Sequence, residues 1–412
     1  MTPFLQKIYD GSIPEMDIFV HELEAYIPLL SELIHTMQDE EWHAEGDVHT
    51  HTDMVLDKLR DLLADDISWL DDDRRFCLVM AAALHDIAKP ITSRVIERHG
   101  RTCIICPNHE EKGRSSLIPQ LLQLEIKPEL VLEIVNLVGY HQMPGRLVRN
   151  DAADSAYFRL ARQVDVQLLY YLELADMRGR VCEGHDKNIE ILNLFRMRLE
   201  ELELWENDDP YEDWQTFFNE QANSYEDSFS IAVYDFETGK INSPEEGLAR
   251  SYSLKNGYPK LILTCGPSGA GKSSWLQSLD ESWVIISLDE LRLELTGSYE
   301  NQKENGTVLQ AAKETLKQHL RQNKKIVWDA TSLRKDHRSA LIKLAMDYGA
   351  LVTIRCYMIS GSELYDRNQK RSKPIPANVL NKQLTAFQFP ELSEAHRLKI
   401  VNSKNVTIVN SP

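Results

Sequence analysis

One stretch of the sequence decides the fold of its second half: Leu261-Ile262-Leu263-Thr264-Cys265-Gly266-Pro267-Ser268-Gly269-Ala270-Gly271-Lys272-Ser273. Its apolar beginning predicts a buried strand, and the residues from Lys272 onward predict a helix. Between the two lies the pattern G-x-x-x-x-G-K-S, whose glycines allow several backbone N–H groups to point toward one phosphate. Because strand and helix stand where the pattern requires them, the stretch predicts a nucleotide-binding loop in an α/β domain.

The residues of this loop have separate expected roles. Lys272 would bring positive charge to the β- and γ-phosphates, and the Ser273 hydroxyl is suited to a Mg²⁺ ion. No motif in the sequence reads the base, so ATP and GTP both remain candidate donors. The expected nucleotide-binding residues are Gly266, Pro267, Ser268, Gly269, Ala270, Gly271, Lys272, Ser273 and Ser274.

The sequence around the loop alternates between short apolar runs and helical segments. The expected strands are Lys260–Cys265, Trp283–Ser287, Lys325–Asp329 and Leu351–Tyr357. Such alternation is typical of a parallel sheet covered by helices.

Charged residues follow two of these segments in positions that suit a second substrate. Asp289 comes after the strand Trp283–Ser287 and could accept a proton from an acceptor hydroxyl, although a helix N-cap is an alternative role. Arg292, one helical turn further on, could hold a substrate phosphate. Arg367 and Arg371 share one face of a helix and could clamp phosphoryl oxygens, a solvated basic helix end being the alternative.

From about Pro259 to the C-terminus, these motifs resemble the 5′-hydroxyl polynucleotide kinase branch of phosphate-loop enzymes. That family pairs the loop with Asp-x-x-Arg after the second strand and with a lid of form R-x-x-x-R. The resemblance implies that Lys272 and Ser273 hold the donor and that Asp289 is the general base on the 5′-OH. It implies further that Arg292 grips the acceptor's neighbouring phosphate, while Arg367 and Arg371 contact the transferring one. Asp329–Arg334 also resembles the family's segment after the next strand, the alternative being that Asp329 is only a carboxylate at the sheet edge.

The first 200 residues read mainly as helix. Apolar residues recur at helical intervals in Leu130–Val138 and Phe158–Leu174, and Asp71–Asp73 supplies an acidic start to the apolar run that ends at Leu84. Thr102–Cys106 carries the one clear strand signal. This part of the chain therefore predicts an all-α domain.

Histidines and aspartates in this part recur at intervals typical of metal ligands. Imidazoles and carboxylates together suit divalent transition metals and Mn²⁺-like ions, and a carboxylate beside a histidine could bridge two of them. Lys89 could neutralise negative charge that develops on a phosphoryl group. A lone histidine is more often a packed residue, so the prediction depends on the whole series: His51, His85, Asp86, His109, His141 and Asp176.

The order of these residues resembles the HD phosphohydrolase superfamily, an all-helical fold with the signature H…HD…H…H…D. The match spans roughly His43 to Arg180, and His85–Pro90 reads like the family's H-D-x-x-K-P. The resemblance implies one metal at His51, His85, Asp86 and Asp176. It assigns His109 and His141 to a second metal or to the substrate phosphate, so the number of ions stays open. Nearby, His43 is a candidate substrate contact and His49 a structural residue.

Charge is distributed unevenly over the 412 residues, whose formal net charge is −18. Residues 310–412 contain 18 Lys and Arg against 8 Asp and Glu, whereas the remaining residues contain 28 against 56. Such asymmetry indicates a polyanionic partner, although on charge alone an acidic surface that aids solubility is an equal alternative. No apolar run approaches the roughly 18 residues that span a membrane. The first ten residues also lack a signal-peptide layout, so the expected location is cytoplasmic with no membrane partner.

We expect three segments: an HD phosphohydrolase domain over 1–205, a connector over 206–256 and a P-loop polynucleotide kinase domain over 257–412. Within the connector, Ser228–Phe236 is expected to form a strand. Together they resemble bacterial HD–Pnk nucleic-acid end-healing enzymes. The resemblance implies a 2′,3′-phosphoesterase acting on 2′,3′-cyclic, 2′- or 3′-terminal phosphates, and a kinase that transfers the NTP γ-phosphate to 5′-OH ends. Its expected partners are RNA or DNA termini and a ligase acting downstream. Alternatives are a small-molecule nucleotide phosphohydrolase with a regulatory P-loop ATPase module and a nucleotide-sensing adaptor without catalysis.

Overall fold

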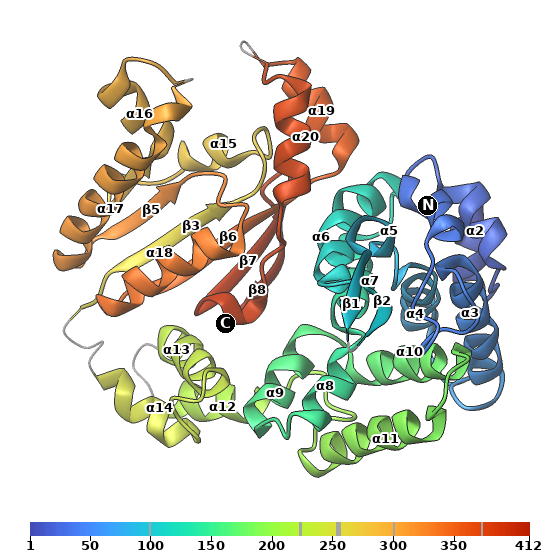
Figure 1. Ribbon diagram of the computed structural model, residues 1–412. Helices are drawn as coiled ribbons and strands as arrows, with labels where there is room; N and C mark the ends of the chain where they lie inside the picture. Colours follow the sequence, from blue (N-terminus) through green and yellow to red (C-terminus); the bar gives the residue numbers. More distant parts are fainter. Residues whose placement is uncertain (99, 222–224, 253–256, 300, 372–373) are drawn as a thin grey trace. The chain divides into compact units, whose positions relative to one another are not determined.

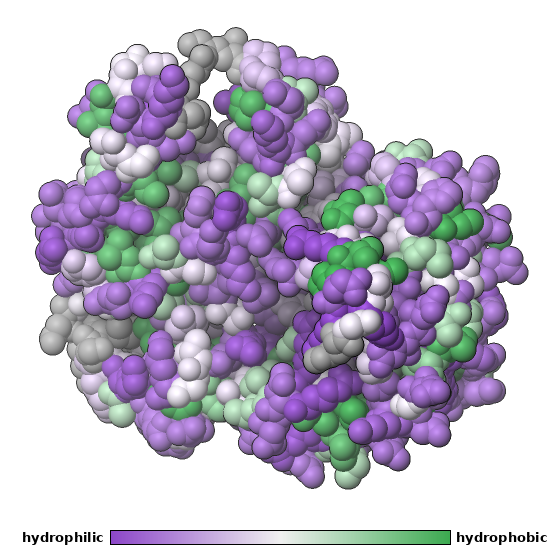
Figure 2. Space-filling view, viewed as in Figure 1, coloured by the Kyte–Doolittle hydropathy of each residue, from purple (hydrophilic) through white to green (hydrophobic). Residues whose placement is uncertain are grey.

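The computed structural model describes residues 1–98, 100–221, 225–252, 257–299, 301–371 and 374–412. The chain forms two compact units, Met1–Pro210 and Tyr211–Pro412 (Figure 1). Hydrophilic residues cover most of the face shown in Figure 2, where hydrophobic residues form small scattered patches. Within the described residues, no helix combines the length and apolar character that a bilayer crossing requires.

The first unit is helical apart from one hairpin. Its elements are α1 (Pro3–Tyr9), α2 (Met16–Leu23), the 3₁₀ helix η1 (Pro28–His35), α3 (Val48–Asp65), α4 (Asp72–Leu84), α5 (Lys89–Thr92), β1 (Arg94–Arg98), β2 (Arg101–Ile105), α6 (His109–Leu121), the 3₁₀ helix η2 (Leu122–Leu124), α7 (Pro128–Tyr140), α8 (Met143–Arg149), α9 (Asp154–Gln163), α10 (Val166–Gly179) and α11 (His185–Glu201).

The core of this unit is made by α3, α4, α7 and α10, which pack against one another. The side chain of Asp71 caps α4 by accepting a hydrogen bond from the Arg74 N–H at 2.8 Å, and every residue from Phe76 to Leu84 is buried. The expected strand Thr102–Cys106 corresponds to β2, which pairs in antiparallel fashion with β1. The prediction of an all-α domain holds for everything except this hairpin.

The second unit begins with α12 (Glu212–Gln221), α13 (Tyr225–Glu237) and α14 (Pro244–Ser251), so most of the expected connector is helical and belongs to this unit. The expectation of a strand at Ser228–Phe236 is wrong, because these residues lie within α13. Phe229, Ala232 and Val233 are buried at i, i+3 and i+4, which is the spacing of a helix face and not the alternation of a strand.

A six-stranded sheet follows, in the order β4-β5-β3-β6-β7-β8, and every neighbouring pair is parallel except β7 with β8. In Figure 1, α18 crosses one face of this sheet. The elements are β3 (Lys260–Cys265), α15 (Lys272–Leu276), β4 (Trp283–Ser287), α16 (Leu288–Thr296), the 3₁₀ helix η4 (Gln302–Glu304), α17 (Asn305–Arg321), β5 (Lys325–Asp329), α18 (Lys335–Asp347), β6 (Leu351–Met358), α19 (Gly361–Gln369), α20 (Ala377–Ala386), the 3₁₀ helix η5 (Leu392–Glu394), β7 (Arg397–Asn402) and β8 (Thr407–Ser411).

The predicted parallel sheet is thus confirmed. The expected strands coincide with β3, β4 and β5, and with β6 to within one residue. Because β3, β4 and β5 are parallel neighbours, their carboxyl ends meet at one edge. The phosphate loop follows β3, Asp289 comes just after β4, and Asp329 is the last residue of β5, which places them around one site.

Candidate active sites

Six histidine and aspartate side chains converge inside the first unit. All six were expected from the sequence, and their exposed fractions lie between 0% and 4%. They lie on α3, directly after α4, at the start of α6, directly after α7 and on α10: His51, His85, Asp86, His109, His141 and Asp176. Five separate segments of the chain therefore supply one buried polar cluster, here called the His/Asp cluster.

The ligand atoms of the His/Asp cluster form two groups, and within each the atoms lie no more than 4.8 Å apart: His51, His85 and Asp176 in one, and Asp86, His109 and His141 in the other. His51 Nε2 lies 2.9 Å from Asp176 Oδ1 in the first group. In the second, His109 Nε2 lies 3.1 Å from Asp86 Oδ1. The other oxygen of Asp86 lies 3.2 Å from His85 Nε2, so this carboxylate joins the two groups.

The imidazoles are oriented as metal ligands usually are. His85 Nδ1 donates to the Ala82 carbonyl and His141 Nδ1 to the Val138 carbonyl, both at 2.8 Å, so each Nε2 faces the cluster. His141 Nε2 is buried and, among the described residues, has no hydrogen-bond partner; its nearest carboxylate oxygen is on Asp86 at 4.0 Å. A buried nitrogen rarely stays unpaired, and a divalent cation would supply the missing partner. The donor set fits one or two such ions.

The electrostatic environment keeps two of these groups, His141 and Asp86, in metal-binding forms. Against the effect of burial, the Asp86 carboxylate raises the pKa of His85 and of His109. Burial, and then the neighbouring His109 and His85, lower the pKa of His141 to about 3, so its imidazole is neutral at physiological pH. Burial opposes ionisation of Asp86, but Lys89 and His85 hold the pKa of this carboxyl group well below its ordinary value. Neutral imidazole and ionised carboxylate are the protonation states that metal binding requires.

Lys89 lies where the sequence placed it, beside the His/Asp cluster. It is only 6% exposed, and its Nζ is 2.6 Å from Asp86 Oδ2 and donates to Gln38 Oε1 at 2.5 Å. His43 is also buried and stands 2.8 Å from Glu45 Oε1, which in turn lies 2.8 Å from His51 Nδ1. Gln38 and Glu45 are thus polar neighbours of the cluster that carry no sequence signal of their own.

His49, expected to be structural, points away to Asp17, with Nε2 at 3.1 Å from Oδ1. Arg180 only marks the end of the matching segment in the sequence, yet in the structure its Nε donates to Asp176 Oδ1 at 3.0 Å. An i,i+4 Asp–Arg pair at the end of a helix could have been found from the sequence.

In the second unit, a cavity of about 620 Å³ opens at the carboxyl ends of β3, β4 and β5. We call it the nucleotide cavity. The expected residues that line it are Ser268, Gly269, Gly271, Lys272, Ser273, Ser274, Asp289, Arg292, Asp329, Arg367 and Arg371. The other three expected loop residues do not line it: Ala270 is packed in the core below, and Gly266 and Pro267 turn their carbonyls to Lys272.

Glycine is needed at two positions of this loop, because Gly269 has a φ of 92° and Gly271 a φ of 110°. The Lys272 ammonium donates to the carbonyls of Gly266 and Pro267 at 2.8 and 2.7 Å. Burial lowers the pKa of Lys272 to about 8 despite the nearby carboxylate of Asp329. Because Lys272 lines the nucleotide cavity, its amine is close to the space in which the phosphates of a nucleotide would lie.

Asp289 and Arg292 face each other across one turn of α16, as the sequence predicts, and form an ion pair. The Asp289 side chain is 76% exposed, so it remains accessible to a second substrate. Its alternative role as the N-cap is excluded because Ser287 occupies that position. Arg292 is 8% exposed and also donates from Nη2 to Asn305 Oδ1 at 3.2 Å, which fixes its guanidinium at the wall of the cavity.

The two lid arginines also line the nucleotide cavity. Arg367 lies on α19, donates to the Ser403 carbonyl at 2.9 Å and pairs with Glu363 at 2.9 Å. Arg371 follows the end of α19, so the expected common helix face does not extend to it. Residues 372–373, which follow Arg371 in the sequence, lie outside the described residues.

Two polar side chains that the sequence analysis did not predict also line the nucleotide cavity. Gln383 of α20 accepts from the Ser268 N–H at 2.8 Å and donates to its hydroxyl at 3.1 Å. Asn405, which precedes β8, also lines the cavity. Both come from segments distant in sequence, so only the folded structure brings them to the loop.

Comparison with known proteins agrees with the division of the chain into two units. Residues 48–176 match the model of the HD domain, and residues 261–390 match that of an AAA domain, which is P-loop kinase-like. A gluconokinase from Sinorhizobium meliloti 1021 is 22% identical over 36% of this chain and 84% of its own, with a TM-score of 0.28. A structure from the PezAT chromosomal toxin–antitoxin system of Streptococcus pneumoniae is 21% identical over 40% of this chain and 80% of its own, with a TM-score of 0.26. The chain therefore joins an N-terminal helical HD domain to a C-terminal P-loop kinase-like domain with a mostly parallel sheet.

Proposed function

We propose that this chain is a bifunctional end-healing enzyme for broken polynucleotides. Its kinase-like domain transfers the γ-phosphate of ATP or GTP to a 5′-OH end. Its HD domain removes 2′,3′-cyclic, 2′- or 3′-terminal phosphates. RNA or DNA termini are then the substrates, and a ligase would consume the healed ends.

In the kinase reaction, the loop from Gly266 to Ser274 and the Lys272 ammonium hold the donor phosphates. Arg292 orients the acceptor through a phosphate, and Asp289 accepts the proton of the 5′-OH as its oxygen bonds to the γ-phosphorus. The bond from that phosphorus to the β–γ bridging oxygen breaks. Arg367 and Arg371 stabilise the negative charge on the transferring group.

In the HD reaction, the six residues of the His/Asp cluster would hold one or two divalent cations. Bound there, such ions supply Lewis acidity to a phosphoryl oxygen and make a water molecule more acidic. Lys89 adds a fixed positive charge beside the cluster, which favours an anionic phosphate and offsets charge developing on it. Hydrolysis adds one water molecule, whose oxygen bonds to phosphorus as the ester oxygen leaves with a proton.

One observation carries the kinase half of the proposal: a single cavity holds the phosphate loop, the Asp289–Arg292 pair and both lid arginines. A regulatory ATPase needs groups that bind nucleotide and position water. It has no need of an exposed carboxylate beside a guanidinium fixed for a second phosphate. This combination favours transfer to an acceptor, and a polynucleotide supplies both the hydroxyl and the adjacent phosphate.

The test uses an RNA oligonucleotide with a 5′-OH and a 2′,3′-cyclic phosphate, together with ATP or GTP and Mg²⁺ or Mn²⁺. Asp289→Asn is expected to slow phosphorylation of the 5′-OH by roughly 10²–10⁴-fold, the usual contribution of general-base catalysis. Glu290→Gln, one residue further and bonded to Tyr299, is the matched control. An unchanged rate in Asp289→Asn would refute the kinase assignment.

For the HD site, Asp86→Asn is expected to abolish opening of the cyclic phosphate and release of phosphate while phosphorylation of the 5′-OH continues. Asp57→Asn, an exposed change on α3, is the control. Loss of both activities together in Asp86→Asn, with the fold intact by circular dichroism, would contradict two separate sites.

A further inference from the structure

The HD unit contains a cavity of about 460 Å³ whose lining is rich in cations. We call it the basic cavity. Its walls come from α8, the end of α10, the start of α11 and the segment before α3. The residues that matter here are Trp42, Gln142, Arg146, Arg149, Arg180 and Lys187.

The basic cavity adjoins the His/Asp cluster. Gln142 lines it and places its Nε2 3.5 Å from His109 Nε2. Arg180 also lines it and donates from Nε to Asp176 Oδ1 at 3.0 Å. Two cavity residues thus contact two of the predicted metal ligands, one in each ligand group. A substrate whose phosphate lies at the cluster could extend directly into the basic cavity.

The basic cavity gathers positive charge although the unit as a whole is acidic. Met1–Pro210 contains 21 Lys and Arg against 40 Asp and Glu, a formal balance of −19. Four cations nevertheless gather in the basic cavity, against the carboxyl groups of Glu173 and Glu183. Such a local reversal of charge attracts an anion to this place on an otherwise repelling unit.

Two of these cations are available to a ligand. Arg146 is held by Glu110 and Gln142, and Arg180 by Asp176. Among the described residues, Arg149 donates from Nη2 only to the neutral amide of Asn188, at 3.0 Å. Within the described parts of the chain, no carboxylate lies within ion-pair distance of Arg149 or Lys187.

An aromatic surface accompanies the cations. Trp42 lines the basic cavity and is 48% exposed, so its ring is open to a planar partner. Cations that contact backbone phosphates, combined with an aromatic ring for a base, are the usual elements of single-stranded nucleic-acid binding. A ligand that carries both a phosphate and a planar ring would use both groups.

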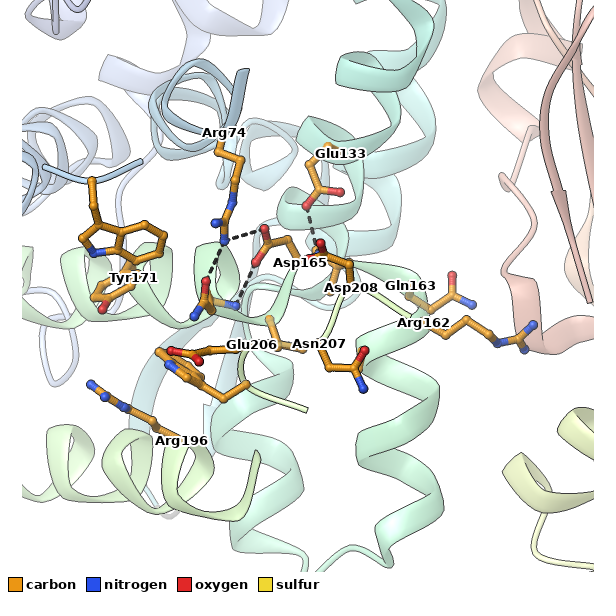
Figure 3. A pocket seen from close by; sticks show the side chains of 16 residues that line it. Arg74, Glu133, Arg162, Gln163, Asp165, Tyr171, Arg196, Glu206, Asn207 and Asp208 are labelled. Carbon is orange, nitrogen blue, oxygen red and sulfur yellow. Dashed lines mark hydrogen bonds and ion pairs between the residues drawn. The ribbon is translucent and has the colours of Figure 1, made fainter. Parts of the chain in front are cut away.

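The unit's larger cavity, of about 680 Å³, offers a contrast (Figure 3). There Arg74 is engaged by Asp165 at 2.8 Å and by Gln167 at 2.8 Å. The same cavity is lined by further carboxyl groups, those of Glu133, Glu206 and Asp208. Arg162 and Arg196 line it as well, so three cations there meet four carboxyl groups, whereas four cations meet two carboxyl groups in the basic cavity. The basic cavity is therefore the better place for a nucleic-acid strand.

We propose that the basic cavity binds the phosphodiester on the 5′ side of the terminal nucleoside, through Arg149 and Lys187, with the preceding base on Trp42. The inference rests on the proposed phosphoesterase activity and makes it specific for strand ends over free mononucleotides. Arg149 and Lys187 act on substrate binding and have no part in the chemical step.

The test compares three substrates in phosphate release by the full chain: a nucleoside 3′-phosphate, the same nucleoside 3′,5′-bisphosphate and a short RNA with a 3′-phosphate. The bisphosphate adds the one phosphate that Arg149 and Lys187 would contact. In the wild-type chain, the KM for the monophosphate is expected to exceed that for the bisphosphate by about tenfold or more, because charge-assisted hydrogen bonds to phosphate are strong. The RNA should have a KM at least as low as the bisphosphate.

The decisive quantity is the ratio of these two KM values in variants, because it does not depend on the fraction of folded enzyme. Arg149→Gln and Lys187→Gln are each expected to bring the ratio toward one, and Trp42→Ala should raise the KM for the RNA alone. Lys58→Gln, an exposed change on α3, is the control and should keep the wild-type ratio.

A wild-type ratio near one, or a high ratio that survives both substitutions, would overturn the inference while leaving the phosphoesterase proposal intact. A wild-type chain that releases phosphate from none of the three substrates contradicts both. The two failures are therefore distinguishable.

Discussion

Replacing Arg338 with methionine should destabilise the kinase-like unit strongly. Arg338 is 0% exposed, and its Nε and Nη2 donate to the two carboxylate oxygens of Glu394, each at 2.8 Å. Its Nη1 donates to the carbonyls of Ser332, Leu333 and Gln388 at 3.1, 3.0 and 2.9 Å. One guanidinium thus joins the segment after β5 to the segment that leads into β7.

The magnitude follows from what the substitution leaves behind. The Glu394 side chain is 3% exposed, so loss of its partner leaves a buried, uncompensated charge, which typically costs about 3–5 kcal/mol. In a unit of about 200 residues, each kcal/mol lowers Tm by about 2–4 °C. Arg338→Met should therefore lower the transition of this unit by about 6–20 °C.

Differential scanning calorimetry of the full chain measures this shift. The transition of the kinase-like unit is recognised because added ATP raises it. The double variant Arg338→Met/Glu394→Leu should be more stable than Arg338→Met, since it leaves no unpaired charge. The reasoning is refuted if Arg338→Met moves the transition by less than about 2 °C, or if the double variant unfolds below the single one.

Three further predictions concern other parts of the molecule. Burial, and then the Asp165 carboxylate, raise the pKa of Glu133 to about 7 (Figure 3). The folded state therefore holds a proton that the unfolded state releases near its ordinary pKa of about 4.5, and the stabilisation is lost as pH rises through 7. Urea unfolding from pH 5 to 8 should show this decline in the wild type and a flatter profile in Glu133→Gln; parallel profiles would contradict it. Asp176→Asn should lower the bound divalent metal, measured by plasma mass spectrometry, by at least one equivalent if the wild type carries its ions, and an unchanged content would exclude Asp176 as a ligand. At saturating substrate, Arg371→Gln should slow phosphate transfer to the 5′-OH end by about tenfold or more, whereas the neighbouring exposed Lys370→Gln should not, and equal effects would assign both to general electrostatics.

Local signals were enough to predict much of the fold. The strands β3 to β6 were predicted because each is a short apolar run between helical segments. The strands β7 and β8 were missed. Lys399 interrupts the apolar residues of Arg397–Asn402, and this strand is held by its parallel pairing with β6. The helix α13 was misread as a strand because its aromatic and β-branched residues favour strands, yet burial of one helix face overrides that preference.

The two sites differ in how far the sequence reveals them. The phosphate loop is contiguous, so its geometry is nearly determined by its own residues. The His/Asp cluster was predicted only because its residues follow a recognisable order over 125 positions, from His51 to Asp176. Gln38, Glu45 and Gln383 belong to no recognisable motif. They reach the two sites only through the tertiary fold, so the sequence alone does not reveal them. The basic cavity likewise depends on helices that meet only after folding.

The lowered pKa of Lys272 should couple nucleotide binding to proton uptake. Its pKa of about 8 means that, near pH 8, about half of the unliganded molecules carry a neutral amine there. Triphosphate binding favours the ammonium form, so each binding event should take up a fraction of a proton from the solvent. The measured heat of binding would then depend on the ionisation enthalpy of the buffer, and donor affinity would decline in alkaline solution even though the triphosphate is already fully ionised there.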